Sequence, residues 1–249
     1  MRRAILVSLA LVLVAGLALT GCQAKKQVIT VATDATWPPF ESVNEQTKEL
    51  EGFDIDLMNA IAKEAGLEIK WVNVPFDSLL AGLASGQYDV GMAVITITPE
   101  RQQQMLFSEP YYNAGQLIAV RVETADINGP ADLKGKKAGG QLGTTGVMEI
   151  EKIEGCEAKV YDTIDQAFLD LMNGQIDAVV ADSPLVWGYV GKYPDKIKAV
   201  GEPFTEEYYG IAVRKGAEDL LAKINKGLAA VKAKGLLDEL NDKWVKGTK

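Results

Sequence analysis

Arg101 and Asp182 are the two charged residues whose surroundings in the sequence point most clearly to binding chemistry. Arg101 carries a planar guanidinium that pairs well with a carboxylate, and Thr98-Pro99 predicts that it lies in the first turn of a helix. Asp182 follows an apolar run that predicts a buried strand. With the hydroxyls of Thr96 and Thr145, these groups suit a zwitterion that places its carboxylate at Arg101 and its ammonium at Asp182. This combination is the head group of an α-amino acid.

Further residues near these positions can complete such a site. The backbone carbonyl of Val94 is a neutral acceptor for an ammonium group. The segment 142–146 (LGTTG) leads directly into a predicted helix, and the N–H groups at the start of a helix favour an anion. Trp37 and Phe76 are aromatic residues that can flank the side chain of a ligand, and Asp34 can read a polar or cationic group on it.

Each of these residues also has a purely structural interpretation. Arg101 can be a solvated helix charge, as most arginines are. Asp182 can be only the N-cap of a helix that begins at Ser183-Pro184. The segment 142–146 can be a plain turn, because it lacks the Lys-Ser/Thr of a phosphate-binding loop. The functional interpretation therefore depends on whether the fold brings these residues to one place.

A repeated unit indicates how the fold could do so. Residues 76–93 (FDSLLAGLASGQYDVGMA) and 164–181 (IDQAFLDLMNGQIDAVVA) share an amphipathic helix, a Gly-Gln-x-Asp turn and an apolar strand. A structural unit that occurs twice suggests two similar lobes with a cleft between them. Chance similarity is the alternative, since helix-Gly-strand units are common in α/β proteins. In the repeat, Val94 and Asp182 occupy equivalent positions.

The remaining pattern predicts an α/β protein in which strands alternate with helices. We expect strands at 27–33, 67–74, 89–96, 116–122, 136–141, 159–161, 176–181 and 208–214. We expect helices after Asp54, Phe76, Thr98, Val147, Thr163 and Ser183, and from 217 to 245 with a break near Gly235. The segment 163–166 (TIDQ) has the spacing of a capping box at the start of its helix. Ligands of largely parallel sheets bind at the carboxyl ends of the strands. Those ends carry Asp34, 94–96, 141–145 and Asp182.

The first residues predict export from the cytoplasm. A short basic start, Met1-Arg2-Arg3, precedes an apolar stretch at 4–18 that is too short for an ordinary transmembrane helix. LTGC at 19–22 resembles the bacterial lipobox, which implies cleavage after residue 21, a lipid on the sulfur of Cys22 and a tether at 22–26. The alternative is an ordinary signal peptide with an incidental cysteine. No later stretch is long and apolar enough to span a bilayer.

Composition excludes several classes of function. The chain has no histidine, which excludes Ser-His-Asp and Cys-His nucleophiles and the commonest ligand of transition metals. Its formal net charge of −8, which loss of Arg2 and Arg3 makes more negative, argues against nucleic acid. If Cys22 carries lipid, Cys156 has no disulfide partner. We therefore expect no metal or cofactor. We also expect a monomer.

Six segments together resemble the extracellular solute-binding proteins of family 3, the polar-amino-acid receptors of ABC importers. They are TDATWPPFE (33–41), GFDIDL (52–57), ITITPER (95–101), FSEPYY (107–112), LGTTG (142–146) and AD (181–182). The resemblance covers nearly all of the chain after the signal segment. It implies a type II periplasmic-binding-protein fold with two lobes, two hinge strands near 112–118 and 206–211, and a ligand cleft between the lobes. The first lobe would comprise 27–112 and 211–249, and the second 113–210.

The resemblance also implies roles for individual residues. The ligand carboxylate would contact Arg101 and Thr145, and its ammonium would contact Val94, Thr96 and Asp182. The walls and the far end of the cleft would be formed by Trp37, Phe76, Asp34, Gln141 and Thr144. Such a site suits an L-amino acid with a long polar or cationic side chain, such as arginine or glutamine.

Two other functions remain open on the same scaffold. Some relatives of this fold are cyclohexadienyl or arogenate dehydratases, for which Glu41 or Asp34 would have to act as the acid. A sensor would bind the same ligand and present the loaded form to a membrane receptor instead of an importer. We expect a binding protein held at the outer face of the membrane by its lipid.

Overall fold

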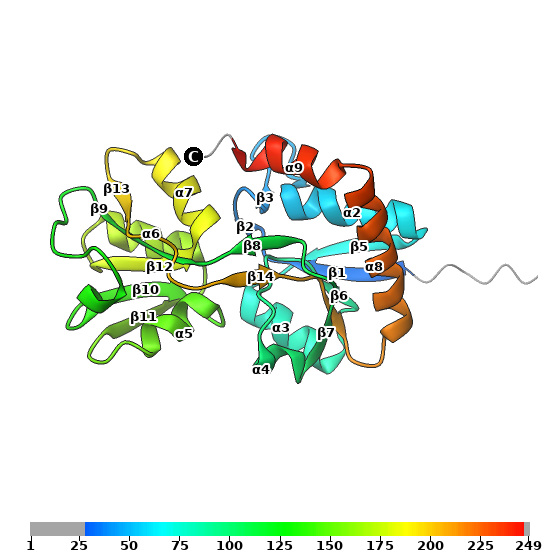
Figure 1. The fold of residues 1–249 in the computed structure, drawn as a ribbon, viewed down its shortest axis with the longest axis horizontal. Coiled ribbons are helices and arrows are strands. Elements are labelled where there is room, and N and C mark those ends of the chain that lie inside the picture. The colour runs from blue at the N-terminus through cyan, green and yellow to red at the C-terminus, as the bar shows by residue number, and fades with distance from the viewer. Residues whose placement is uncertain (1–27, 247–249) are drawn as a thin grey trace, which may run out of the picture.

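The computed structural model describes residues 28–246, which form two α/β lobes (Figure 1). The expected signal segment 1–21, Cys22 and the tether 22–26 lie outside the described residues. The first lobe is built on a sheet of order β5-β1-β6-β15-β7, and the second on a sheet of order β11-β10-β12-β9-β13. Within residues 28–246, no helix has both the length and the hydropathy needed to cross a membrane.

In the sheet of the first lobe, β1 is parallel to both of its neighbours, β5 and β6. Its strands are β1 (Val28–Thr33), β5 (Glu68–Asn73), β6 (Val90–Gly91), β7 (Met105–Phe107) and β15 (Ala212–Arg214). Its helices are α2 (Phe53–Ala65), α3 (Phe76–Ser85), α4 (Pro99–Gln102), α8 (Glu218–Ala233) and α9 (Leu236–Trp244). A small sheet is formed by β2 (Thr36–Trp37), β3 (Glu41–Val43) and β4 (Leu50–Glu51). The break predicted near Gly235 is confirmed, since α8 ends before it and α9 begins after it.

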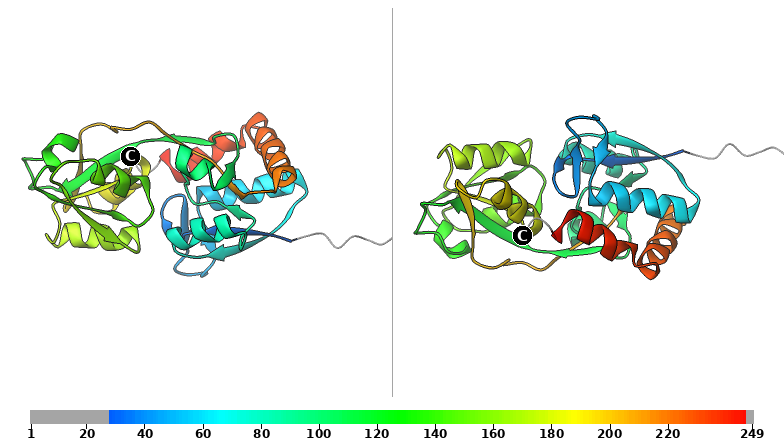
Figure 2. Two further views of the ribbon diagram at one scale, coloured as in Figure 1. Left: turned by 90° about the horizontal axis from the view of Figure 1, so that it is seen from below. Right: turned by 90° about the horizontal axis from the view of Figure 1, so that it is seen from above.

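The apolar face of α2 joins the C-terminal helices to the core of the first lobe. Leu57, Met58 and Ile61 on this helix are fully buried, as their spacing requires. Gly227 lets α8 approach closely, because a Cβ atom there would lie 2.8 Å from the carbonyl oxygen of Ile61. The orange and red C-terminal helices therefore lie beside the cyan α2 in the views of Figure 2.

The second lobe repeats this arrangement. Its strands are β9 (Gln116–Arg121), β10 (Lys137–Gln141), β11 (Glu157–Tyr161), β12 (Ala178–Asp182) and β13 (Ile197–Val200). Its helices are α5 (Thr145–Glu151), α6 (Ile164–Met172) and α7 (Ser183–Lys192), with a short 3-10 helix, η2 (Pro130–Leu133). β10 is parallel to β11 and β12, whereas β9 is antiparallel to β12.

Two short strands connect the lobes. β8 (Tyr112–Ala114) and β14 (Glu207–Tyr209) form an antiparallel pair that runs from one lobe to the other (Figure 1). The chain enters the second lobe through β8 and returns through β14, after which β15, α8 and α9 join the first lobe. The sequence predicted lobe boundaries at 112/113 and 210/211. These boundaries stay a prediction.

The repeat seen in the sequence is confirmed in detail. Its helices are α3 and α6, and the glycine after each has a left-handed backbone, with φ of 77° at Gly86 and 72° at Gly174. Asp89 then accepts a hydrogen bond of 3.0 Å from the backbone N–H of Thr30 on β1. Asp177 accepts the equivalent bond of 2.8 Å from Lys137 on β10. The aspartate therefore fixes its turn against β1 in the first lobe and against β10 in the second.

Three local predictions were wrong. The strand predicted at 89–96 is only β6, because the chain leaves the extended conformation and Val94 has a φ of 43°. The strand predicted at 208–214 is divided at Gly210, where a Cβ atom would lie 2.9 Å from the side chain of Ile97. The capping box expected at Thr163 is not formed, since this residue precedes α6 without a side-chain capping bond.

Candidate functional site

A cavity between the lobes gathers most of the residues singled out in the sequence. The cavity is small, with a volume of about 10 Å³. Its walls are Trp37, Phe76, Val94, Thr96 and Arg101 from the first lobe, with Thr144, Thr145 and Asp182 from the second. Asp34 and Gln141 are buried beside this cavity but do not line it. The carboxyl ends of strands in both sheets therefore meet at one place, as the α/β pattern predicted.

Arg101 provides a buried positive charge on the wall from the first lobe. The Thr98 hydroxyl caps α4 by accepting from the backbone N–H of Arg101 at 3.2 Å, which fixes this short helix. The guanidinium donates from Nη1 to the carbonyl oxygen of Thr96 (2.8 Å) and from Nη2, across the cleft, to that of Gly143 (3.0 Å). The residue is only 6% exposed and its Nε has no partner. Burial lowers its pKa to about 10.

No carboxylate among residues 28–246 forms an ion pair with Arg101. The guanidinium instead lies over the ring of Phe76, with 5.4 Å between the guanidinium carbon and the ring centroid. A buried cation is costly unless a counter-charge accompanies it. Arg101 is therefore built to receive an anion that the described part of the chain does not supply.

Asp182 provides the opposite charge on the wall from the second lobe. It precedes α7, but its side chain makes no capping bond, so the N-cap interpretation does not account for it. Its carboxylate accepts from the hydroxyl of Tyr209 (2.5 Å) and from Nε2 of Gln116 (2.6 Å). Burial chiefly raises its pKa to about 7, and the neighbouring charge of Glu207 contributes. Asp182 can therefore change its ionisation near neutral pH.

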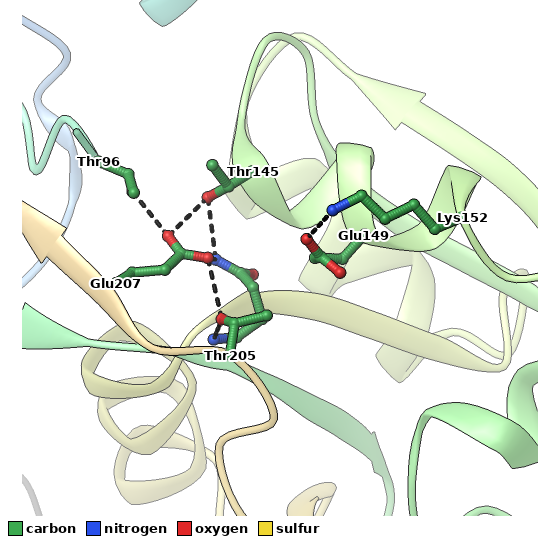
Figure 3. Close-up of polar contacts among 7 residues, drawn as sticks. Thr96, Thr145, Glu149, Lys152, Thr205 and Glu207 are labelled. Carbon is green, nitrogen blue, oxygen red and sulfur yellow. Dashed lines mark hydrogen bonds and ion pairs between the residues drawn. The ribbon is translucent and has the colours of Figure 1, made fainter. Parts of the chain in front are cut away.

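Glu207 and Gln116 are the site residues that the sequence did not reveal. The carboxylate of Glu207, on β14, accepts from the hydroxyls of Thr96 (2.7 Å) and Thr145 (2.9 Å), as Figure 3 shows. The predicted hinge at 206–211 included Glu207, but nothing in the sequence distinguished it from Glu206. The hydroxyl proton of Thr145 thus points to Glu207 and not to a ligand carboxylate. The backbone N–H of Thr145, as the first residue of α5, remains a donor without an intrahelical partner.

Asp34, Gln141 and Trp37 form a hydrogen-bonded chain across the cleft. The Gln141 amide donates to Asp34 at 2.7 Å, and the Trp37 indole N–H donates to the Gln141 carbonyl oxygen. Thr36 also donates to Asp34 at 3.0 Å. Burial raises the pKa of Asp34. Within the described residues this carboxylate has amide and hydroxyl donors but no ion pair.

The comparison with known proteins decides the family. The model of the bacterial extracellular solute-binding proteins, family 3, matches residues 29–247. The chain belongs to this family.

Relatives of this family 3 protein are named as amino-acid-binding proteins. The putative ABC transporter arginine-binding protein 2 of Escherichia coli (strain K12) is 37% identical over 239 residues, which cover 93% of this chain and 96% of the relative. An ancestral arginine-binding protein bound to arginine has a TM-score of 0.85 at 43% identity, covering 88% of this chain and 99% of the other. The same type of ancestral protein bound to glutamine has a TM-score of 0.84 at 44% identity, covering 88% and 98%. The type II two-lobe fold is thereby confirmed.

Val94 of this family 3 protein is held in a conformation that valine rarely adopts. Its φ of 43° lies in the left-handed region, which is unfavourable for a β-branched residue. The fully buried carboxylate of Asp54 accepts from the Val94 N–H (3.0 Å) and from the hydroxyl of Tyr111 (2.7 Å). Strain of this kind persists only where the surroundings impose it, often at functional sites. Asp54 therefore fixes the direction of the chain where Val94 lines the cavity.

No group of His, Cys, Asp and Glu side chains between residues 28 and 246 is arranged to hold a metal ion. Cys156 is a half-buried free thiol, and burial raises its pKa.

Proposed function

We propose that this protein binds a polar or cationic L-amino acid outside the cytoplasmic membrane and delivers it to an ABC importer, with arginine as the first candidate. The observation that carries the proposal is the pair Arg101 and Asp182. They are buried opposite charges on different lobes, they line one cavity, and Arg101 makes no ion pair among the described residues. The family and the names of its arginine-binding relatives support the same class of ligand.

The charges suggest how the ligand would be held and how it would close the lobes. Its carboxylate contacts Arg101 and the backbone N–H of Thr145, while its ammonium contacts Asp182, Thr96 and the Val94 carbonyl. Trp37 and Phe76 flank its side chain. Since the two ends of the ligand are bound by different lobes, only the closed arrangement satisfies both, so the ligand shifts the population toward closure.

Asp34 supports a cationic side chain. A buried carboxylate without an ion pair is best compensated by a positive group, and Asp34 bonds to Gln141, which lies on the other lobe. A guanidinium that reaches past Trp37 could donate to Asp34 while the Gln141 amide turns its oxygen toward the same group.

The substitution Asp34→Asn is expected to weaken arginine binding about ten- to a hundredfold, because a hydrogen bond to a charged group contributes about 1.5–3 kcal/mol. Citrulline has the same shape without the charge, and its affinity should change little. Isothermal titration with both ligands measures the difference. Asp77→Asn, an exposed aspartate on the neighbouring α3, is the matched control. An equal loss for both ligands would show that Asp34 acts only through packing.

The class of ligand is tested by thermal unfolding in the presence of each of the common amino acids. A ligand at a hundredfold excess over its dissociation constant stabilises the protein by about 2.7 kcal/mol through mass action. We expect arginine to give the largest increase in Tm, followed by other long polar or cationic amino acids. A scan in which none of them raises Tm would refute the proposal.

The dehydratase alternative gains no support from the geometry. Glu41, one candidate acid, is fully buried, does not line the cavity and has no hydrogen-bond partner for either oxygen. Asp34, the other candidate, already accepts from Gln141 and Thr36.

The proposed location includes a lipid on Cys22 that tethers a monomer to the membrane. The basis is the LTGC segment at 19–22. In cells that process bacterial lipoproteins, the wild-type protein should fractionate with membranes, and Cys22→Ser should appear in the soluble fraction. Equal distribution of the two would contradict the anchor.

A further inference from the structure

We propose that Glu207 is a positioning residue that turns two cavity threonines into hydrogen-bond acceptors and so makes the site select for a ligand with an amine. This inference rests on the proposed function and assigns a determinant of its specificity. Glu207 lies on the hinge strand β14, is 7% exposed, and reaches Thr96 from the first lobe and Thr145 from the second (Figure 3).

The direction of these hydrogen bonds carries the argument. A threonine hydroxyl has one proton to donate and two lone pairs that accept. Thr96 and Thr145 each give that proton to the same oxygen of Glu207, Oε2. Both residues also line the cavity. The Gln116 amide lies 3.1 Å from the Thr145 hydroxyl oxygen and can occupy one of its two lone pairs. The capacity that each threonine hydroxyl has left is therefore that of an acceptor, which suits the N–H groups of an ammonium and is unfavourable for a carboxylate.

The charge of Glu207 acts in the same direction. Nε2 of Gln116 lies 2.6 Å from Oδ1 of Asp182 and 3.1 Å from both Oε1 of Glu207 and Oγ1 of Thr145, so its two N–H groups are shared among these three acceptors. Neither carboxylate forms an ion pair within residues 28–246. Two carboxylates held this close form a negative pole at the wall of the cavity. A ligand ammonium is the group that such a pole lacks.

The competing explanation is that Glu207 only holds the lobes and the hinge together. Its bonds to Thr96, Thr145 and Thr205 would serve that purpose equally well. If Glu207 only held the lobes and the hinge together, its substitution would change the affinity of every ligand by the same factor. Substitution of a residue that sets the amine site would change the affinity only of the ligands that carry the amine.

The test compares arginine with 5-guanidinopentanoate, which keeps the guanidinium, the chain and the carboxylate but lacks the α-amine. Both are titrated calorimetrically into wild type and Glu207→Gln. The amide of the variant has no charge and donates protons to the threonine oxygens, so arginine affinity should fall about tenfold or more. The affinity of the amine-free ligand should stay level or rise. An equal loss of affinity for both ligands would overturn the inference and show that Glu207 has only a structural role.

A pH series adds a readout that a structural role would not move. The charge of Glu207 helps to raise the pKa of Asp182, so its removal should shift the acid midpoint of arginine binding to lower pH. Glu206→Gln is the matched control, since Glu206 is exposed on the adjacent position and contacts Tyr208 instead of the cavity. It should leave both affinities and the midpoint unchanged.

A second variant keeps the test decisive if Glu207→Gln does not fold. Thr145→Val removes the hydroxyl and keeps the shape of the side chain. If this hydroxyl is an acceptor for the amine, arginine affinity falls and that of 5-guanidinopentanoate does not. If the hydroxyl instead donates to the ligand carboxylate, both affinities fall and the inference is wrong. Failure of wild type to bind arginine at all would refute the choice of arginine, and the same pair of variants would then be tested with the amino acid that binds and its des-amino analogue.

Discussion

The substitution Arg101→Ala is expected to weaken amino-acid binding by about a hundredfold to a few thousandfold. Loss of one partner of a buried charge pair costs about 3–5 kcal/mol, and each 1.4 kcal/mol is a factor of ten in affinity. The cost is high because the ligand carboxylate would enter a buried wall whose only described guanidinium is Arg101, which is 6% exposed. Isothermal titration with arginine measures the effect.

Two variants control this experiment. Arg101→Lys keeps the charge but loses the fork that reaches both Thr96 and Gly143, so its affinity should lie between those of wild type and alanine. Arg214→Ala removes an arginine whose pairing is with Asp89, away from the cavity, and should bind normally. A loss of less than tenfold for Arg101→Ala would refute the role assigned to this residue.

The second large effect is expected from Asp182→Asn, with a loss of about a hundredfold because the ligand ammonium loses its buried counter-charge. The wild-type affinity should also depend on pH. The pKa of Asp182 is raised to about 7, so it must lose a proton before it can pair with an ammonium. Affinity should therefore fall by up to about tenfold for each pH unit below about 7. Titrations between about pH 5 and pH 8 measure this slope, since the ligand's own carboxyl group ionises well below that range.

Asp182→Asn is also the control for the pH series, because it should remove most of the dependence of affinity on pH. The raised pKa of Asp182 also predicts how the stability of the protein without ligand depends on pH. The raised pKa means that the folded protein without ligand binds a proton more tightly than the unfolded chain, so the contribution of Asp182 to stability is full below about pH 4 and is lost as pH rises through about 7. Wild-type affinity that stays constant across this range would contradict the ionisation assigned to Asp182.

The sequence was sufficient where a local pattern and the fold agree. The repeated helix-turn-strand unit predicted two lobes, and the carboxyl ends of the strands then placed Arg101 and Asp182 on one cavity. Both predictions rely on periodicity and on a general property of parallel sheets, which do not require knowledge of side-chain conformations.

The sequence was insufficient where tertiary contacts determine the burial or the backbone conformation of a residue. Glu206 and Glu207 are identical neighbours, and only the pairing of β14 with β8 makes the first exposed and the second buried between the lobes. Val94 is a good strand former, yet its hydrogen bond to the distant Asp54 holds it in a left-handed turn. The contact between Asp34 and Gln141 needs both lobes to be placed before it exists.

The position of β15 has a consequence for biogenesis. This strand lies between β6 and β7 in the sheet of the first lobe, but it follows every strand of the second lobe in the chain. A polypeptide emerges from its N-terminus, so the second lobe can complete its sheet while the first still lacks an interior strand. Until then β6 and β7 present unpaired edges, which are sites of aggregation. We therefore expect these strand edges to stay exposed until β15 has been made, so the lobe that begins first along the chain is the last to complete its sheet.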